Sequence, residues 1–451
     1  MIRGDGVRKI DDAKDCGSLS VGIDIGTTTI SATVYDVKNG TQLESYCVFH
    51  DSCVVSDVFF EQSANIIIDK ANCLLDKILD TYKGVASIGV TGQMHGIVYI
   101  DCDGKHVSNL INWQDKRADK VLDDGKSVCQ RIYEITKENI YAGYGIATHY
   151  YNVLFGTVPK EAVGFVSIMD LFAMKICALK NVVIHASVAS SFGLFDLKKF
   201  DFMMDKLDLL GIDRGFLPKV TEKSVIIGEY REIPVSIPIG DNQASFLGSV
   251  GENNSSLLVN IGTGAQISAV NDYFEAKGDI ELRPFIEGRY LVCGSSLCGG
   301  FAYSMLEGFF RSYYVSCNMP NEPQYEIINR LALDAYERGE EGLCVDTTFM
   351  GKRSNPNLRG SIKNIGKESF TPANLALGVL KGICNELYEL YNEFPIMHTR
   401  IVASGGAIKK NQLLKTLIGE RFQMELSEAS VNEEASVGAA LFSHLAISKF
   451  E

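Results

Sequence analysis

The chain has 451 residues, of which 46% are hydrophobic and 22% charged, and its formal net charge is −13 at pH 7. This length predicts two domains, and the composition is that of a soluble globular protein. The acidic balance argues against nucleic acid or an anionic membrane bound through a basic surface. It leaves room for a nucleotide, because backbone N–H groups and a metal ion can hold phosphates.

Three features of the sequence bear on where in the cell the protein is located. Residues 1–18 are rich in charge and lack an apolar signal region, so we expect a disordered tail. The 12 cysteines include no C-x-x-C pair, which favours reduced, buried thiols in a cytoplasmic protein. The apolar window 162–179 is interrupted by Asp170 and Lys175, which predicts a buried helix and not a membrane span.

The first structured segment is a predicted hairpin over residues 19–36. Two β-rich runs flank Gly26, Thr27 and Thr28, and Asp24 ends the first run. One interpretation is a plain hairpin. The functional interpretation is a phosphate cradle with Asp24 facing a metal ion, because a carboxylate beside a polyphosphate needs a cation between them.

Residues 256–270 repeat this pattern. The segment from Asn260 to Gly264 matches Asp24 to Thr28 at a constant offset of 236 positions. Such a duplication predicts two similar α/β domains, each presenting a hairpin to a shared cleft. Because Asn260 stands where the first hairpin has Asp24, only one side would offer a carboxylate to a metal.

Two loops follow predicted strands at 85–90 and 109–112, at the carboxyl ends where open α/β sheets bind ligands. The first loop contains Gln93, Met94 and His95, and the second contains Trp113 and Asp115. Alone, His95 is more typical of a structural histidine and Trp113 of a core residue.

Asp241 lies where an apolar run ends and a small-residue helix begins, within residues 236–245. It is either the N-cap of that helix or a catalytic base. The two roles are compatible, because a helix N-terminus stabilises the ionised carboxylate that a base must be.

Later segments add long predicted helices at 58–82 and 373–394 and a polar, irregular stretch at 310–359. The pair Gly405 and Gly406 joins a strand to a helix, so the backbone can approach a flat ring or a phosphate closely. A final helix at 434–447 begins with small residues that suit close packing on a sheet.

Together these motifs resemble the FGGY carbohydrate kinases, in family order over about residues 19–447. The resemblance implies an α/β fold of two actin-like (ribonuclease H-like) domains of duplicated topology with a cleft between them. It makes residues 19–246 the N-terminal domain, on the sugar, Mg²⁺ and phosphate side, and 247–451 the C-terminal domain, on the nucleotide side.

The resemblance also implies roles for single residues, with ATP and Mg²⁺ as ligands. Asp241 would be the catalytic base and, with Asp24, would face the Mg²⁺. The sugar pocket would be lined by Gln93, Met94, His95, Trp113, Asp115, Asp241 and Asn242. The nucleotide would contact Gly26, Thr27, Thr28, Gly262, Thr263, Gly264, Gly299, Gly300, Gly405, Gly406 and Asn411.

Within the family, the motifs at 91–96, 112–117, 143–148 and 240–245 look most like those of sedoheptulokinases, with xylulokinases next. We therefore expect phosphorylation of the terminal primary hydroxyl of sedoheptulose. The alternatives are a pentulose kinase or a non-catalytic ATP-binding switch of the actin or chaperone type.

Two departures from the family pattern stand out. Residues 186–191 lack the Asp-x-x-Asn-Ala-Ser-like segment of related kinases, and the C-terminal part is short for the family. The sequence does not fix the oligomeric state, and a homodimer is compatible with it.

Overall fold

The computed structural model describes residues 18–55, 59–251, 255–275 and 277–449. The expected tail at 1–18 therefore lies outside the described residues, apart from Ser18. The chain forms two compact units. Unit 1 contains the residues up to Leu194, Met203–Ser245 and those from Ala435, and unit 2 contains Phe195–Phe202 and Phe246–Glu434.

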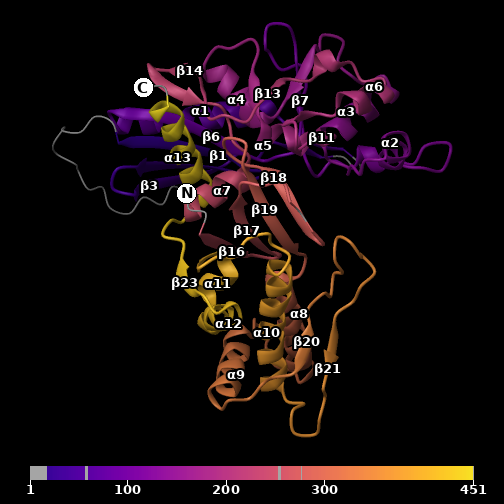
Figure 1. Cartoon of the computed structure of the whole chain (residues 1–451), viewed down its shortest axis with the longest axis vertical. Coiled ribbons are helices and arrows are strands. Elements are labelled where there is room, and N and C mark those ends of the chain that lie inside the picture. Colours follow the sequence, from indigo (N-terminus) through magenta and orange to yellow (C-terminus); the bar gives the residue numbers. More distant parts are fainter. Residues whose placement is uncertain (1–17, 56–58, 252–254, 276, 450–451) are drawn as a thin grey trace. The chain divides into compact units, whose positions relative to one another are not determined.

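Unit 1 is built on a six-stranded mixed sheet of order β14-β15-β6-β1-β2-β3 (Figure 1). Neighbours β1, β6 and β15 pair in parallel, whereas β2 and β3 pair antiparallel. Strand β1 buries Val21, Ile23 and Ile25 on one face and Ser20 and Gly22 on the other, so the sheet is covered on both faces there. The strands are β1 (Leu19–Ile25), β2 (Thr29–Asp36), β3 (Thr41–Phe49), β6 (Val85–Gly92), β14 (Ile226–Tyr230) and β15 (Ile233–Ser236).

Helix α1 (Ala64–Thr81) packs against β1 and β2. Its buried residues recur every three or four positions, as on an amphipathic helix, and the Ser63 side chain caps its first turn. The helix predicted at 58–82 therefore begins too early. The cap at Ser63 stops the helix there, and residues Phe60–Gln62 form strand β5.

Helix α13 (Glu434–Ser448) is the last of the chain, yet it lies against the first strands, seen as yellow beside indigo in Figure 1. A Cβ added to Gly22 would stand 1.7 Å from the carbonyl oxygen of Ser436, and one on Gly89 would stand 1.9 Å from that of Ala439. The helix backbone thus touches the sheet directly, which confirms the close packing predicted for this helix.

Unit 2 has a second six-stranded sheet, of order β18-β19-β17-β16-β22-β23. Strands β16, β22 and β23 are parallel and β17 and β19 antiparallel, so β19-β17-β16-β22-β23 repeats β3-β2-β1-β6-β15. The predicted α/β fold of two actin-like halves is confirmed. The strands are β16 (Ser256–Ile261), β17 (Ala265–Asn271), β18 (Ile280–Pro284), β19 (Tyr290–Ser296), β22 (Arg400–Ser404) and β23 (Glu425–Glu428).

The core helix of unit 2 is α10 (Pro372–Tyr391), which packs against α8 (Gly299–Ser316), α9 (Tyr325–Glu337) and α12 (Gln412–Phe422). The stretch 310–359, expected to be irregular, contains the end of α8, all of α9 and strand β20 (Cys344–Asp346). Helix α9 was not predicted because only one narrow side of it is buried, so its sequence has a largely polar composition.

Shorter elements complete both units. They are β4 (Cys53–Val55), β5 (Phe60–Gln62), β7 (Val98–Ile100), β8 (Leu110–Ile111), α2 (Val128–Thr136), α3 (Gly145–Leu154), β9 (Gly164–Val166), α4 (Ile168–Ile176), β10 (Val183–His185), α5 (Ala186–Ala189), β11 (Phe195–Asp196), β12 (Asp201–Phe202), α6 (Met204–Leu209), β13 (Lys219–Thr221), α7 (Asp241–Val250), β21 (Ser361–Lys363) and α11 (Gly406–Lys410).

The compact units differ from the expected domains 19–246 and 247–451 in two segments. Helix α13 belongs to unit 1, because its small residues pack on β1 and β6. The hairpin β11–β12 belongs to unit 2. The division after Ser245 falls inside α7, one residue before the expected boundary.

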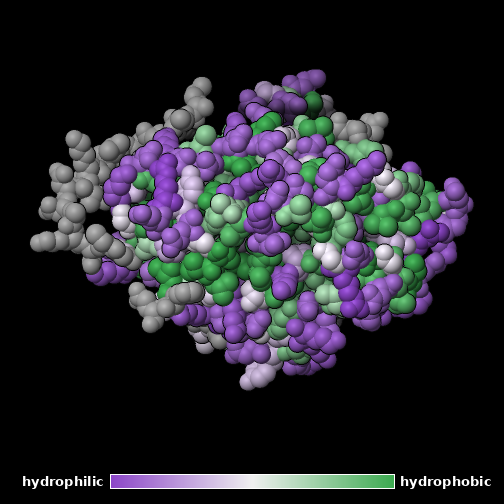
Figure 2. Space-filling model, turned by 90° about the horizontal axis from the view of Figure 1, so that it is seen from above, coloured by the Kyte–Doolittle hydropathy of each residue, from purple (hydrophilic) through white to green (hydrophobic). Residues whose placement is uncertain are grey.

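The described cysteines are free thiols, as predicted, but six of them are exposed and not buried: Cys47, Cys53, Cys73, Cys102, Cys317 and Cys344. The window 162–179 contains the nine-residue buried helix α4. Within the described residues, every helix falls short of the length and apolar character that a membrane crossing requires. The face seen in Figure 2 mixes hydrophilic and hydrophobic residues.

His398 of unit 2 gives a prediction for stability against pH. Only 5% of this residue is exposed, and burial lowers its pKa from 6.5 to about 4. Between these values the unfolded chain binds the proton and the folded chain does not, so the free energy of unfolding falls as the pH falls. The full shift corresponds to about 3 kcal/mol.

We expect His398→Phe to remove this part of the acid sensitivity. Urea unfolding of wild type and variant at pH 7 and pH 5 measures it. An equal loss of stability in both proteins would contradict the assignment.

Candidate active site

The carboxyl end of β6 brings together residues from three parts of unit 1. On one side, Asp24 of β1 pairs with Thr91. On the other side, Ile239 donates its N–H to the carbonyl of Val90 at 3.0 Å, and Thr91 Oγ1 donates to the Ile239 carbonyl at 2.7 Å. The backbones leading to Asp24 and Asp241 therefore flank β6, two strand spacings or about 10 Å apart.

Asp241 is the first helical residue of α7, and it is half-buried. The Ala244 N–H donates to the carbonyl of Gly240, so Gly240 is the N-cap. The interpretation of Asp241 as the capping residue is wrong by one position. Its carboxylate instead lies in the first turn, where the helix dipole favours the ionised form.

The Gly240 backbone is held from two sides. Its N–H donates to Ser187 Oγ at 3.0 Å, and an added Cβ would stand 2.9 Å from Met94 Cε. The Met94 side chain therefore lies directly over the junction that presents Asp241. Asn242 follows in the first turn of α7 and is also half-buried.

His95 adopts a left-handed backbone conformation, with φ 71°. Ser191 holds it twice, because the His95 N–H donates to Ser191 Oγ at 3.1 Å and Nδ1–H donates to the Ser191 carbonyl at 2.7 Å. Because a carbonyl oxygen can only accept, this contact places a proton on Nδ1, and in the neutral imidazole the lone pair is then on Nε2. The ring of Tyr144 stacks on the imidazole at 4.4 Å. A strained residue fixed in this way suits ligand binding.

The two loops after β6 and β8 meet the first hairpin turn. Trp113 is 46% exposed, so it is not the core residue that its type favours, and its Nε1–H donates to Thr27 Oγ1 at 2.9 Å. Gln93 is 5% exposed, and its Nε2 donates to the Gly26 carbonyl at 3.4 Å. Gln93 Oε1 is buried and has no hydrogen-bond partner among the described residues, so it can accept a bond from a ligand.

Asp115 does not face a ligand. It is 1% exposed, and its oxygens accept bonds from the Phe60 N–H and from the N–H, Nε and Nη2 of Arg117, at 2.8–3.0 Å. Burial disfavours the charged guanidinium, but the bonds to Asp115 and Glu61 outweigh it and raise the pKa of Arg117. We therefore correct the expected sugar contact of Asp115: the residue holds the loop that carries Trp113.

The second hairpin, in unit 2, is held by main chain. Gly300 and Phe301, at the start of α8, donate their N–H groups to the carbonyls of Gly262 and Thr263 at 2.9 and 2.8 Å. Asn260, at the position of Asp24, donates to Ser404 Oγ at 2.7 Å. The offset of 236 positions holds only through the turn, because Ile261 pairs with Ala265 whereas Ile25 pairs with Ile30.

The glycines predicted near the nucleotide fall into two groups. A Cβ on Gly299, Gly300 or Gly405 would stand 2.3–2.5 Å from backbone atoms of the hairpin strand and turn, so these glycines are required for packing. A Cβ on Gly262 or Gly406 would meet nothing within 4 Å, so these two border open space. The turn residue Gly264 lies 3.0 Å, at its Cβ position, from the Ser296 carbonyl.

Asn411 was a candidate for nucleotide binding. Its Oδ1 accepts the Leu414 N–H at 3.0 Å and caps α12, and its Nδ2 donates to Asn329 Oδ1 at 3.0 Å. We correct its role to that of a helix cap.

The described residues contain no group of three or more His, Cys, Asp or Glu side chains that could hold a metal ion by themselves. The two carboxylates expected to face Mg²⁺, Asp24 and Asp241, are too few to form such a group. Mg²⁺ is usually bound through one or two carboxylates, with water and substrate phosphates completing the shell.

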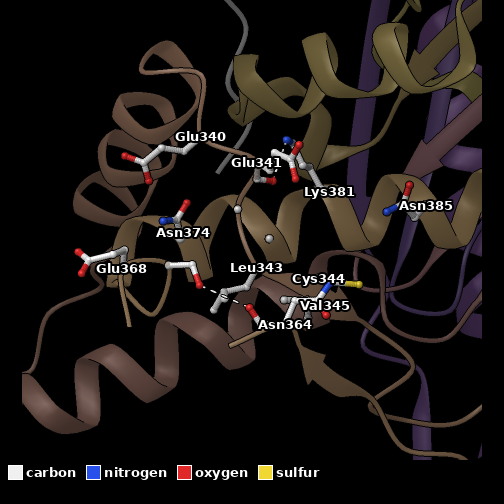
Figure 3. A pocket seen from close by; sticks show the side chains of 13 residues that line it. Glu340, Glu341, Leu343, Cys344, Val345, Asn364, Glu368, Asn374, Lys381 and Asn385 are labelled. Atoms are coloured by element: carbon white, nitrogen blue, oxygen red, sulfur yellow. Dashed lines mark hydrogen bonds between the residues drawn. The ribbon is translucent and has the colours of Figure 1, made fainter. Parts of the chain in front are cut away.

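Two cavities lie elsewhere. In unit 2 a cavity of about 660 Å³ is lined by residues of the α9–β20 connection, by Asn364 and Glu368, and by one side of α10 (Figure 3). Lys381 Nζ donates there to the carbonyl of Glu341 at 2.9 Å. In unit 1 a cavity of about 250 Å³ lies beside Arg117 and Tyr151. Neither contains a predicted site residue.

Sequence reasoning missed Ser187, Ser191 and Tyr144. The serines lie in the segment 186–191, whose departure from the family pattern suggested that it had lost its contacts. The two serines instead hold the backbones of Gly240 and His95. Tyr144 belongs to a glycine- and tyrosine-rich turn, and the side that its ring faces depends on tertiary structure.

The chain matches two family profiles. Residues 19–248 match the FGGY family of carbohydrate kinases, N-terminal domain, and residues 316–447 match the C-terminal domain of the same family.

Curated relatives cover nearly the whole chain. Sedoheptulokinase of Mus musculus is 23% identical over 473 residues, covering 94% of this chain and 96% of the relative. Xylulose kinase of Staphylococcus xylosus is 23% identical over 455 residues, covering 93% and 89%. Gluconokinase of Bacillus subtilis is 22% identical over 469 residues, covering 96% and 88%.

Solved structures with the same fold include the xylulose kinase from Rhodospirillum rubrum, with TM-score 0.77 and 18% identity, and the gluconate kinase from Lactobacillus acidophilus, with TM-score 0.76 and 20% identity. Each covers 96% of this chain and 90% of the other. At these identities the structures support the fold alone.

The corrected role of Asp115 is testable. Asp115→Asn removes one of the two carboxylates bonded to the buried Arg117 and leaves only the less buried Glu61, so we expect the free energy of unfolding to fall by about 2 kcal/mol. Asp241→Asn is the matched control, because a half-buried carboxylate in a first helical turn contributes about 1 kcal/mol or less. Urea unfolding measures both. If Asp115→Asn kept wild-type stability and lost only ligand binding, Asp115 would be a ligand contact after all.

Proposed function

The chain belongs to the FGGY family of carbohydrate kinases, and from that premise we propose that it transfers the γ-phosphate of ATP to the terminal primary hydroxyl of sedoheptulose. The observation that carries the chemistry is the pair of carboxylates, Asp24 and Asp241, on the two sides of β6. A non-catalytic switch would need the hairpins but would not need the loops of His95 and Trp113 beside that pair.

Asp241 is the proposed base. A free aspartate has a pKa of about 3.9, far below that of a sugar hydroxyl, so it does not remove the proton beforehand. It orients the hydroxyl and accepts its proton as the bond to the γ-phosphorus forms and the bond from that phosphorus to the bridging oxygen breaks, releasing ADP. Asp241 lies in the first turn of α7, where the helix dipole favours the ionised form that a base requires.

Asp24 is the second proposed carboxylate. With Asp241 it would face Mg²⁺, which when bound neutralises charge on the β- and γ-phosphates. Thr27 and Thr28 of the first turn, and Thr263 and Gly264 of the second, would offer N–H groups and hydroxyls to phosphate oxygens. Gly26 and Gly262 would shape these turns beside the phosphates, because their N–H groups donate to the carbonyls of Thr29 and Gly264. Most of the rate enhancement would come from this positioning, since phosphoryl transfer needs little covalent help from the protein.

The sugar contacts proposed are Gln93, Met94, His95, Trp113 and Asn242. His95 offers an acceptor nitrogen, and Gln93 offers a buried acceptor oxygen. Both suit hydroxyl donors of a polyol. The exposed ring of Trp113 can lie against the carbon chain.

The choice of sedoheptulose is supported by similarity along the whole chain to sedoheptulokinases and by the loop motifs. A pentulose kinase is the alternative, supported by the xylulose kinase relatives. Identities of 22–24% do not separate these sugars.

Substitution of the base tests the mechanism. Asp241→Asn removes the proton acceptor and keeps the shape, so we expect kcat to fall by about 10²–10⁴-fold with ATP binding retained. Coupled ADP-release kinetics and nucleotide titration measure the two properties. Near-wild-type turnover in a folded Asp241→Asn protein would exclude Asp241 as the base.

A substrate panel tests the acceptor. We expect kcat/KM for sedoheptulose to exceed that for xylulose, ribulose, glycerol and gluconate in the presence of Mg²⁺ and ATP. ADP release with each acceptor measures it. A preference for a pentulose would replace the substrate and leave the mechanism, whereas no sugar-dependent ADP release with any acceptor would remove both.

A further inference from the structure

Side chains bind the carbonyl oxygens of the first hairpin turn. The Gly26 carbonyl accepts bonds from His50 Nε2 at 3.1 Å and from Gln93 Nε2 at 3.4 Å. The Thr27 carbonyl accepts a bond from Gln62 Nε2 at 2.8 Å. The Gly26 N–H donates to the Thr29 carbonyl at 2.9 Å. With these carbonyls held by the protein, the turn has the N–H groups and hydroxyls of Thr27 and Thr28 to offer to a phosphate.

Gln62 is the centre of this network. It is fully buried on β5, and its Oε1 accepts bonds from Gln93 Nε2 at 3.0 Å and Asn112 Nδ2 at 3.2 Å. Gln93 begins the loop after β6, and Asn112 begins the loop after β8. A single amide therefore contacts the hairpin turn and both loops.

The rest of β5 strengthens the connection to the second loop. The Phe60 N–H donates to Asp115 Oδ2 at 2.8 Å, and Glu61 accepts a bond from Arg117 Nη2 at 2.8 Å. In addition, β5 pairs with β8 directly before that loop. Three consecutive residues of one short strand thus hold the loop that carries Trp113.

The second hairpin provides a contrast. The carbonyls of Gly262 and Thr263 are bound by main-chain N–H groups of α8. A main-chain contact to a helix holds a turn in place without connecting it to side chains of a sugar loop. The link between turn and loops is therefore a feature of unit 1 alone among the two described hairpins.

We propose that Gln62 is a positioning residue that couples sugar binding at the two loops to phosphate binding at the first hairpin. The inference rests on the proposed function. A sugar that orders Gln93 and Asn112 fixes the Gln62 amide, and this amide in turn fixes the Thr27 carbonyl and the direction of the turn. Sugar and nucleotide then bind cooperatively, since ordering by one ligand need not be repeated for the other.

The test is a double titration. The Kd of sedoheptulose is measured by calorimetry, alone and with the Mg²⁺ complex of the β,γ-imido analogue of ATP. The ratio of the two values is the coupling factor, and for wild type we expect at least about 5. For Gln62→Met we expect a factor within about twofold of 1, with the Kd of the sugar alone changed by less than about threefold.

Ser87→Ala is the matched control. Ser87 is a fully buried hub at the other end of β6, bonded to Ser20 Oγ at 2.9 Å and Ser443 Oγ at 2.8 Å. The Ser87→Ala variant should have a lower melting temperature, because a buried hydrogen-bonding group is removed, yet keep the wild-type coupling factor.

Gln62→Glu is the second variant if Gln62→Met does not fold, because it keeps the acceptor for Gln93 and Asn112 and removes the donor to Thr27.

The outcomes are separable. Wild-type coupling in a folded Gln62 variant, equal loss of coupling in Ser87→Ala, or a wild-type factor near 1 would each overturn the role of Gln62 and leave the kinase function standing. A wild type that binds neither sedoheptulose nor a pentulose would overturn the proposed function, and with it the inference.

Discussion

The parallel pairing around β6 is the constraint on which the site in unit 1 depends. Asp24 lies opposite Thr91 because β1 and β6 share a register, and the chain that leads to Asp241 follows the other edge of β6 through the bonds of Ile239. A slip of one residue in either pairing would turn one carboxylate to the opposite face. The apolar side chains Val21, Ile23 and Ile25 are buried on one face of the sheet, and a slip that turned them to the face of Ser20 and Gly22 is therefore resisted.

The duplicated topology explains why the two units carry similar turns with different chemistry. Protein donors bind the turn carbonyls of both hairpins. In unit 1 side chains bind the carbonyls of Gly26 and Thr27, and the His50 N–H binds that of Thr28, whereas in unit 2 N–H groups of α8 bind those of Gly262 and Thr263. The carboxylate of unit 1 is replaced in unit 2 by Asn260, whose amide is bonded to Ser404. At this position unit 2 therefore has an amide with a structural contact where unit 1 has a carboxylate.

Buried polar groups behind the loops determine their shape. Asp115 and Arg117 form a buried pair under the loop of Trp113, and Ser191 holds the strained backbone of His95. Such groups are costly to bury unless every donor and acceptor is matched. Their presence behind the loops of Trp113 and His95 indicates that these loops are held in one precise arrangement.

Local pattern was sufficient for the architecture. The repeated apolar strands and Gly-Thr turns predicted two α/β halves, and the apolar run into Gly240 placed Asp241 at a strand–helix junction. These features depend on residues near in the sequence, where periodicity and turn chemistry act.

Which polar residues face a ligand was decided by contacts between distant segments. Asp115 and Asn411 look like ligands until Arg117 and the start of α12 occupy them, and Gln62 gains its position only when β5 meets the turn and both loops. Helix α13 joins unit 1 for the same reason, since only the folded sheet brings Gly22 and Gly89 to its backbone.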